Sequence, residues 1–254
     1  MDRKVKPMSV TQNEKAVRFH ALHDGPGAFV IPNPWDVGSA RILAGLGFQA
    51  LATSSAASAA ALGRRDGGLT RDEALAHARL IVEATDLPVS ADLEKGFGDA
   101  PEVVAETIRL AAEAGLVGCT IEDATGNQQR PLYDVGLAVE RIAAAAQAAR
   151  ALQFSFILTA RAHNLLYANP SLDDTIKRLQ AFEKAGADVI QGVPLIKGYG
   201  ASHQNGLLLL FISQLPSIRE GQLSDPLFWP IQKIRKVLAK SIEQPLVLIW
   251  EGYL

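Results

Sequence analysis

Residues 114–123 read Ala-Gly-Leu-Val-Gly-Cys-Thr-Ile-Glu-Asp: the end of a helix, a glycine, a short apolar strand and two acids. Glycine often ends a helix because it adopts the left-handed conformation at little cost. The same unit occurs at residues 46–48 (Leu-Gly-Phe) and 185–187 (Ala-Gly-Ala). Helices and strands that alternate in this way are typical of βαβ units and a parallel sheet.

Outward from this stretch, residues 10–190 show a regular alternation of predicted helices and strands. Strands are expected at residues 28–31, 48–53, 87–91, 117–121, 154–159 and 187–190. Helices are expected at residues 10–23, 36–46, 70–84, 100–114, 135–152 and 171–184, the third of them opened by a Thr-Arg-Asp-Glu capping box. So many units favour an α/β fold of the (β/α)8 TIM-barrel type over a doubly wound sheet. Barrels of this length commonly form one domain, which we expect over residues 1–254.

The C-terminal quarter, residues 191–254, does not continue this alternation. It contains an apolar run at 207–212, a predicted helix at 228–242 and a predicted strand at 245–249. Either the apolar run is a strand inside a long insertion, or the barrel is incomplete, or the chain is truncated. We therefore expect an incomplete or irregular barrel in this quarter.

The composition argues against several classes of partner. The formal net charge is -2 and no basic run is present, so we expect no binding to nucleic acid or to a membrane surface. No apolar run approaches the roughly 20 residues of a membrane span, and residues 1–10 lack the apolar core of a secretory signal. The single cysteine, Cys119, cannot form an internal disulfide, which favours a reducing compartment and a cytoplasmic protein. We expect Cys119 to be buried and inert.

Two acids, Asp92 and Glu94, lie one residue apart at the end of a predicted strand. Alternate residues of a strand share a face, so both carboxylates would point the same way. Carboxylates this close repel each other unless a cation or a proton lies between them. Mg²⁺ suits such a pair because it binds one or two carboxylates and keeps several waters. The alternative is a pair of solvated acids before a turn.

Polar side chains also follow the neighbouring predicted strands. In a barrel, the carboxyl ends of the strands form one rim, where catalytic groups lie. The rim residues expected here are Asn33, Trp35, Asp36, Thr53, Ser54, Ser55, Asp92, Glu94, Glu122, Asp123, Arg161, His163 and Asn164. This set suits a divalent cation that chelates a small carboxylate, which Arg161 would bind through two parallel hydrogen bonds. We expect His163 to be solvated, with a role as acid or base as the alternative.

Six motifs follow one another along the chain: Asn-Pro-Trp-Asp at 33–36, Thr-Ser-Ser at 53–55, Leu-Gly-Arg-Arg-Asp at 62–66, Asp-Leu-Glu-Lys-Gly-Phe-Gly at 92–98, Gly-Cys-Thr-Ile-Glu-Asp at 118–123 and Ala-Arg at 160–161. Together they resemble the isocitrate lyase/phosphoenolpyruvate mutase superfamily, which includes phosphonomutases and 2-methylisocitrate lyases. The resemblance implies a (β/α)8 barrel that requires Mg²⁺, with Mn²⁺ as an alternative. It also implies a homo-oligomer (dimer or tetramer) that acts on 2-oxo acids or their aldol-type precursors.

The resemblance further implies roles for individual residues. Three are implied as metal-binding, Asp92 directly and two through bound waters: Asp92, Glu94 and Glu122. Three are implied as catalytic, including the acid of a gating loop and the substrate-carboxylate arginine: Ser55, Asp66 and Arg161. The implied substrate-binding set is Trp35, Asp36, Ser55, Ala56, Ala57, Asn127 and Arg161.

The loop at residues 124–131, Ala-Thr-Gly-Asn-Gln-Gln-Arg-Pro, departs from the family pattern. The lyase branch carries a Lys-Lys/Arg-Cys-Gly-His motif there, and its cysteine is the catalytic acid or base. The phosphonomutase branch carries a Lys and an Asn, of which Asn127 alone has a counterpart here. Since this loop has no Cys, Lys or His, cleavage of isocitrate or methylisocitrate is not expected. In addition, Ala56 stands where relatives usually have Gly.

The preferred interpretation is a Mg²⁺-dependent lyase that cleaves a C–C bond of a small 2-oxo or 2-hydroxy dicarboxylate through a metal-bound enolate. Decarboxylation needs no dedicated base to begin, whereas retro-aldol cleavage does. The first alternative is a phosphoenolpyruvate mutase or phosphonopyruvate-type enzyme acting on P–C bonds, with Arg64 or Arg130 as the cation for the phosphoryl oxygens. The second is a catalytically inactive barrel that binds a carboxylate.

Overall fold

The computed structural model describes residues 10–25, 29–167, 171–192, 208–214 and 244–250. The helices are α1 (Gln12–Asp24), α2 (Val37–Gly45), α3 (Ser55–Ala61), α4 (Arg71–Ala84), α5 (Pro101–Glu113), α6 (Val135–Arg150) and α7 (Leu172–Ala185), with a short 3-10 helix η1 (Asn164–Leu166). The strands are β1 (Phe29–Pro32), β2 (Leu51–Ala52), β3 (Val89–Asp92), β4 (Gly118–Glu122), β5 (Ile157–Ala162), β6 (Val189–Gly192), β7 (Leu208–Gln214) and β8 (Gln244–Trp250).

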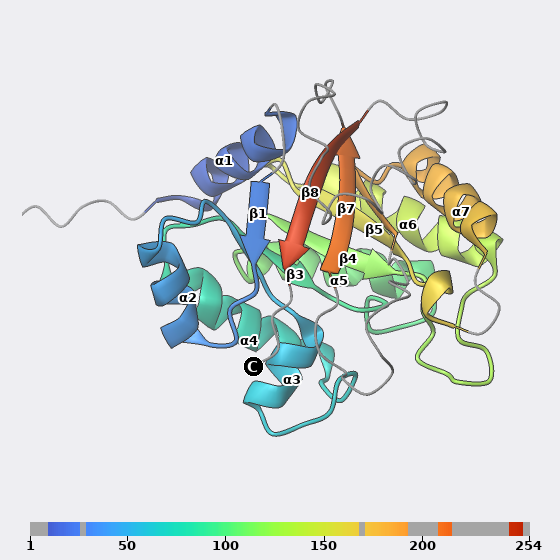
Figure 1. Cartoon of the computed structure of the whole chain (residues 1–254), viewed down its shortest axis with the longest axis horizontal. Coiled ribbons are helices and arrows are strands. Elements are labelled where there is room, and N and C mark those ends of the chain that lie inside the picture. Colours follow the sequence, from blue (N-terminus) through green and yellow to red (C-terminus); the bar gives the residue numbers. More distant parts are fainter. Residues whose placement is uncertain (1–9, 26–28, 168–170, 193–207, 215–243, 251–254) are drawn as a thin grey trace, which may run out of the picture.

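All eight strands belong to one curled sheet in the order β1-β8-β7-β6-β5-β4-β3-β2, with helices around its outside (Figure 1). Strands β2 to β6 run parallel to one another, and β8 runs parallel to β1. This α/β fold with a curled, mainly parallel sheet is consistent with a TIM-type barrel, so the predicted fold class is confirmed at that level.

Strand β7 is antiparallel to both of its neighbours, β6 and β8. The strands of a (β/α)8 barrel are all parallel, so the expected irregularity of the C-terminal quarter is confirmed. An antiparallel neighbour, unlike a parallel one, does not require a crossover helix. The predicted strand at 245–249 coincides with β8, whereas the helix predicted at 228–242 lies outside the described residues.

Local signals fix the ends of several helices. Thr70 and Glu73 form the expected capping box, in which the Thr70 hydroxyl accepts from the Glu73 amide and the Glu73 carboxylate accepts from the Thr70 amide. Pro101 opens α5, where its missing N–H costs nothing. Gly186 ends α7 at a φ of 105°, which favours glycine. These signals are local in sequence, which is why the helices could be predicted.

Strand β5 is longer at its carboxyl end than predicted. It continues through Arg161 to Ala162, because β4 pairs with it as far as Arg161 and β6 as far as Ala162. Arg161 is therefore a strand residue with its backbone held on both sides.

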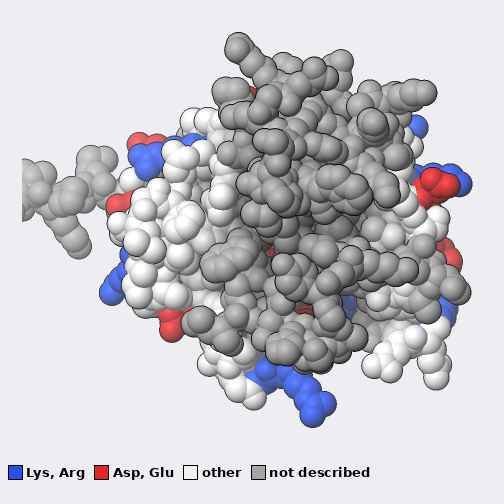
Figure 2. All heavy atoms as spheres, viewed as in Figure 1, with Lys and Arg blue, Asp and Glu red and all other residues white. Residues whose placement is uncertain are grey.

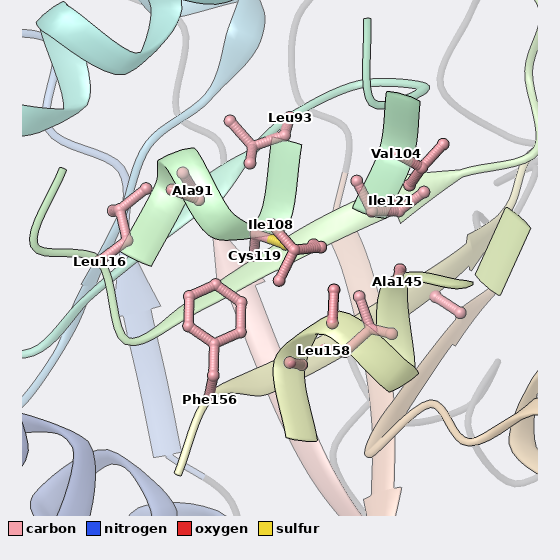
Figure 3. Packing of buried hydrophobic residues seen from close by; sticks show 14 of the residues in the cluster. Ala91, Leu93, Val104, Ile108, Leu116, Cys119, Ile121, Ala145, Phe156 and Leu158 are labelled. Carbon is pink, nitrogen blue, oxygen red and sulfur yellow. The ribbon is translucent and has the colours of Figure 1, made fainter. Parts of the chain in front are cut away.

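The main core lies between the sheet and helices α4 to α7. Figure 3 shows side chains from β3, β4 and β5, such as Ala91, Cys119 and Leu158, converging with Ile108 of α5 and Ala145 of α6. Cys119 is fully buried, as expected, and burial raises the pKa of its thiol far above the ordinary range. The thiol is thus part of the apolar core.

Strands β1 and β2 are the two edge strands of the sheet. Side-chain hydrogen bonds connect the chain near the carboxyl ends of these two strands. The Asn33 Nδ2 donates to the backbone oxygen of Ala52 at 2.7 Å. The ring of His77 in α4 adds a second link, with Nε2 2.8 Å from the Trp35 carbonyl oxygen and Nδ1 3.0 Å from the Ser58 hydroxyl in α3. We call this junction the β1–β2 seam.

On the face shown in Figure 2, basic and acidic side chains alternate along the left and right edges of the described surface. In the described part of the chain, no helix has the length and apolar character needed to cross a membrane.

Candidate active site

The turn after β3, residues 92–98, has a constrained backbone. Among the described residues, the only non-glycine residues with positive φ are Glu94 at 50° and Phe97 at 62°, both in this turn. Gly96 between them has a φ of 80°, and an added Cβ there would lie 3.1 Å from the Val104 side chain. Such conformations cost about 1–3 kcal/mol each for ordinary residues and cluster at functional sites.

Asp92 is the last residue of β3, and both of its carboxylate oxygens accept hydrogen bonds. Oδ1 accepts from the Glu94 amide at 3.0 Å, and Oδ2 accepts from the Ser55 hydroxyl at 3.0 Å. Ser55 begins helix α3, which lies at the end of the sheet toward which β1 and β8 point (Figure 1). The structure therefore brings together Ser55, Asp92 and Glu94, as the sequence predicted.

Arg161 of β5 connects two acids across the sheet. Its Nη2 lies 3.4 Å from both oxygens of Asp92 and forms an ion pair with Glu122, the residue beside it in β4. The side chains of Arg161 and Asp92 are each 9% exposed. Ion pairs are strong when water is largely excluded, so this guanidinium holds Asp92 and Glu122 toward one point.

Glu122 also lies within ion-pair distance of His163, 3.0 Å from Nε2. Burial disfavours the carboxylate of Glu122, but Arg161 and His163 outweigh burial and hold its pKa at about 2. The His163 side chain is only 12% exposed, so the expectation of a solvated histidine is wrong. The His163 amide donates to the buried Asp123 carboxylate at 2.8 Å, and this bond keeps the residue against β4.

Asp123 supports the site rather than lining it. Its side chain is almost completely buried and accepts a 3.1 Å hydrogen bond from Arg178 of α7. Burial raises the pKa of Asp123, while the bonds from His163 and Arg178 oppose that shift.

Negative charge accumulates around Glu94. Burial, and then the charges of Asp92 and Asp66, raise the pKa of Glu94 to about 7. The residue Asp66 is exposed as a whole, but its carboxyl group is partly buried, and this burial together with Asp92 raises its pKa while a hydrogen bond with Ser55 opposes the shift. The loop that carries Asp66 therefore places this acid beside Ser55 and Asp92.

The other predicted substrate-binding residues lie in different settings. Ala56 and Ala57 follow Ser55 in the first turn of α3, and Trp35 is half-buried at the β1–β2 seam. Asp36 is exposed and accepts from the Ser39 amide at 2.7 Å as the N-cap of α2. Asn127 is exposed and accepts from the Gln129 amide at 2.9 Å. The hydrogen bonds of these last two side chains are to chain neighbours rather than to the acids.

Gln191 of β6 was not among the residues expected from the sequence. It lies beside Arg161 in the sheet register and is 0% exposed. Within the described part of the chain, neither of its amide atoms has a hydrogen-bond partner. Buried polar groups nearly always have partners, so this amide is suited to a ligand or a water. A polar residue directly after the strand predicted at 187–190 was the signal available in the sequence.

The acids fit a magnesium ion by their chemistry. Among the described residues, no three His, Cys, Asp or Glu side chains form a ready-made metal cage. Mg²⁺ does not need one, because it binds through one or two carboxylates and keeps most of its waters. Asp92, Glu94 and Glu122 offer only oxygen donors. Burial is the main cause of the raised pKa of Glu94, and the charges of Asp92 and Asp66, which a bound cation would offset, add to it.

Comparison with known proteins gives consistent matches. Residues 19–197 match the family model described as phosphoenolpyruvate phosphomutase. The 2-methylisocitrate lyase of Bacillus subtilis (strain 168) is 34% identical over 190 residues, which cover 71% of this chain and 60% of that protein. The chain thus spans less than two thirds of the length of this relative.

Solved structures that resemble this chain also carry lyase, mutase or phosphonopyruvate hydrolase names. A candidate lyase/mutase from Burkholderia cenocepacia J2315 is 59% identical, with a TM-score of 0.70 over 71% of this chain and 65% of that chain. A phosphonopyruvate hydrolase in complex with oxalate and Mg²⁺ is 26% identical, with a TM-score of 0.67 over 74% of this chain and 65% of that chain.

Proposed function

Because this chain belongs to the phosphoenolpyruvate mutase/isocitrate lyase superfamily, we propose that it is a Mg²⁺-dependent lyase that cleaves a C–C bond in a small 2-oxo or 2-hydroxy dicarboxylate. The observation that carries this proposal is the group of acids at the ends of β3 and β4, joined by the buried Arg161. A complete (β/α)8 barrel, a homo-oligomer and a cytoplasmic location are further parts of the same proposal.

The residues would divide the work as follows. Asp92 would bind Mg²⁺ directly, and Glu94 and Glu122 would hold waters bound to it. Bound there, Mg²⁺ would stabilise the negative charge that develops on a substrate oxygen when the C–C bond breaks. Arg161 would bind the substrate carboxylate, since a guanidinium offers two parallel donors to a carboxylate. Ser55 would donate to a substrate oxygen, and Asp66 would exclude water as part of its loop.

The loop after β4 favours decarboxylation among the possible reactions. It folds on itself: the Thr125 amide donates to the Pro131 carbonyl oxygen, and Ala124 pairs with Leu132. It offers no Cys, Lys or His to start a retro-aldol cleavage. In the alternative reaction at a P–C bond, Arg64 would bind the phosphoryl oxygens. Arg64 already forms an ion pair with Glu73 at 2.7 Å, which makes it less available for that role.

A panel of substrates tests the proposed reaction. With Mg²⁺, the purified protein is expected to release pyruvate or glyoxylate from at least one 2-oxo or 2-hydroxy dicarboxylate, oxaloacetate first, measured by mass spectrometry. Because metal ions alone decarboxylate oxaloacetate, the rate is compared with that of the Asp92→Ala variant under the same conditions. Turnover of phosphonopyruvate alone, followed by phosphorus NMR, would support the P–C alternative. A rise in melting temperature with Mg²⁺ and oxalate but no turnover would support the inactive barrel.

Gln191→Leu is expected to raise the thermal stability of the protein and to lower its affinity for a substrate analogue. A buried polar group without partners costs about 1–3 kcal/mol, so the leucine variant should melt at a higher temperature than the wild type when no ligand is present. If the amide binds the substrate or a water beside it, the affinity for oxalate with Mg²⁺ should fall, as calorimetry would measure. Ile190→Leu, at the adjacent position of β6, is the control. Unchanged oxalate affinity would remove Gln191 from the site.

A further inference from the structure

Arg141 of α6 is a buried charge whose hydrogen bonds all reach one short segment. The residue is 1% exposed. Its Nη1 donates to the carbonyl oxygens of Gly98 and Asp99, at 2.6 Å each, and its Nη2 donates to that of Lys95. Two of the three acceptors belong to the turn at residues 92–98, which begins with Asp92 and Glu94, and the third directly follows it.

Tyr133 completes this contact. The guanidinium of Arg141 lies over the Tyr133 ring, 4.1 Å from its centroid, in a cation–π arrangement. The Tyr133 hydroxyl donates to the Asp99 carboxylate at 2.5 Å, and that carboxylate also pairs with Lys95 at 2.9 Å. The backbone of the turn and the Asp99 side chain directly after it are therefore held by Arg141 of α6 and by Tyr133, two residues before that helix.

The turn needs such a restraint because its conformation is unfavourable. Glu94, Gly96 and Phe97 all have positive φ, a region that L side chains rarely adopt. Packing alone would be achieved at lower cost by an apolar side chain, since burying a charge requires good compensation.

From these contacts we propose that Arg141 is a positioning residue of the metal site: it holds residues 95–99 so that Glu94 remains beside Asp92. The consequence for metal binding depends on the function proposed above, whereas the restraint on the turn does not. The hydrogen bonds of Arg141 go to backbone carbonyl oxygens and not to the carboxylates of Asp92, Glu94 or Glu122. Arg141 acts through the backbone of the turn.

Two variants of Arg141 test this role. Arg141→Lys keeps the positive charge but cannot reproduce the planar fork that reaches three carbonyl oxygens, and Arg141→Met removes the charge. Arg150→Met is the matched control, because Arg150 lies on the same helix and donates to a single carbonyl oxygen, that of Gly186, at 3.0 Å. Ile142→Val, a buried position beside Arg141, controls for a general loss of stability.

The first measurement is hydrogen exchange of the metal-free protein. Arg141→Lys is expected to increase exchange in residues 93–99 while β4 and α5 keep their protection, and neither control variant should do so. The second measurement is Mn²⁺ affinity, read from the electron paramagnetic resonance signal of free Mn²⁺. Changes around metal ligands typically cost 10–100-fold in affinity, and we expect about tenfold weaker binding for Arg141→Lys.

The outcomes separate this inference from the proposed function. Unchanged exchange in residues 93–99 would overturn the restraint. Increased exchange with unchanged Mn²⁺ affinity, or an equal loss of affinity in Ile142→Val, would overturn the link to the metal site. A wild-type protein that binds no Mn²⁺ would contradict the proposed function and the metal link, while the exchange experiment would still decide whether Arg141 holds the turn.

Discussion

Asp92→Ala is expected to abolish Mg²⁺ binding, whereas Glu94→Gln is expected only to weaken it. The reason is the difference between a direct ligand and a carboxylate that holds a metal-bound water. Loss of the direct ligand removes the bond itself, whereas loss of a supporting group typically costs 10–100-fold in affinity. Calorimetric titration of each variant with Mg²⁺ measures both effects.

The contacts around Asp92 should make the effect of Asp92→Ala on activity larger than the loss of the metal ligand alone. Its carboxylate accepts from the Ser55 hydroxyl and from the Glu94 amide, and it pairs with Arg161. Asp92→Ala therefore loosens three neighbours, and we expect activity below detection. Circular dichroism should show that both variants remain folded. Equal losses of Mg²⁺ affinity in the two variants would contradict the division between direct and water-mediated ligands.

Arg161→Met is expected to cost both stability and substrate binding. Removing one partner of a buried ion pair typically costs about 3–5 kcal/mol, because the other charge is left uncompensated. Here two acids, Asp92 and Glu122, would lose their partner. The same change removes the proposed carboxylate clamp, so kcat/KM should fall by about 100-fold or more if the clamp contributes 3 kcal/mol. Urea unfolding and steady-state kinetics measure the two effects.

Magnesium provides a second readout for Arg161. In the Arg161→Met variant, the ion would be the principal positive charge available to the acids, so Mg²⁺ should raise the melting temperature more than it does in the wild type. Arg161→Lys, which retains charge but not the bidentate geometry, should recover stability better than substrate binding. A variant with normal stability and normal KM would exclude the clamp.

The features that could be predicted from sequence are those with local causes. Helices α4 and α5 begin at a capping box and a proline, and Gly186 ends α7. The position of acids at strand ends followed from the alternation of strands and helices. A parallel sheet then brings such ends to one rim, and for that reason Asp92 and Glu122 could be expected to lie near Arg161.

The features that could not be predicted depend on distant contacts. An apolar run does not show the direction in which a strand pairs, so the antiparallel direction of β7 could not be predicted from the sequence. The burial of His163 depends on the extension of β5 and on Asp123, which is 40 positions earlier in the chain. Arg141 lies in an alanine-rich helix, where a charged residue usually faces solvent, and its acceptors are 42 to 46 positions away.

The β1–β2 seam differs from the other junctions of the sheet in what holds it closed. Elsewhere in the sheet, backbone hydrogen bonds join neighbouring strands, so a side-chain substitution does not directly remove any of these hydrogen bonds. At the seam, Asn33 and His77 make the connection, and Trp35 and Ser55 lie on its two sides. A single base change in the gene can therefore alter how the two sides of the proposed substrate site are joined without removing a hydrogen bond between strands.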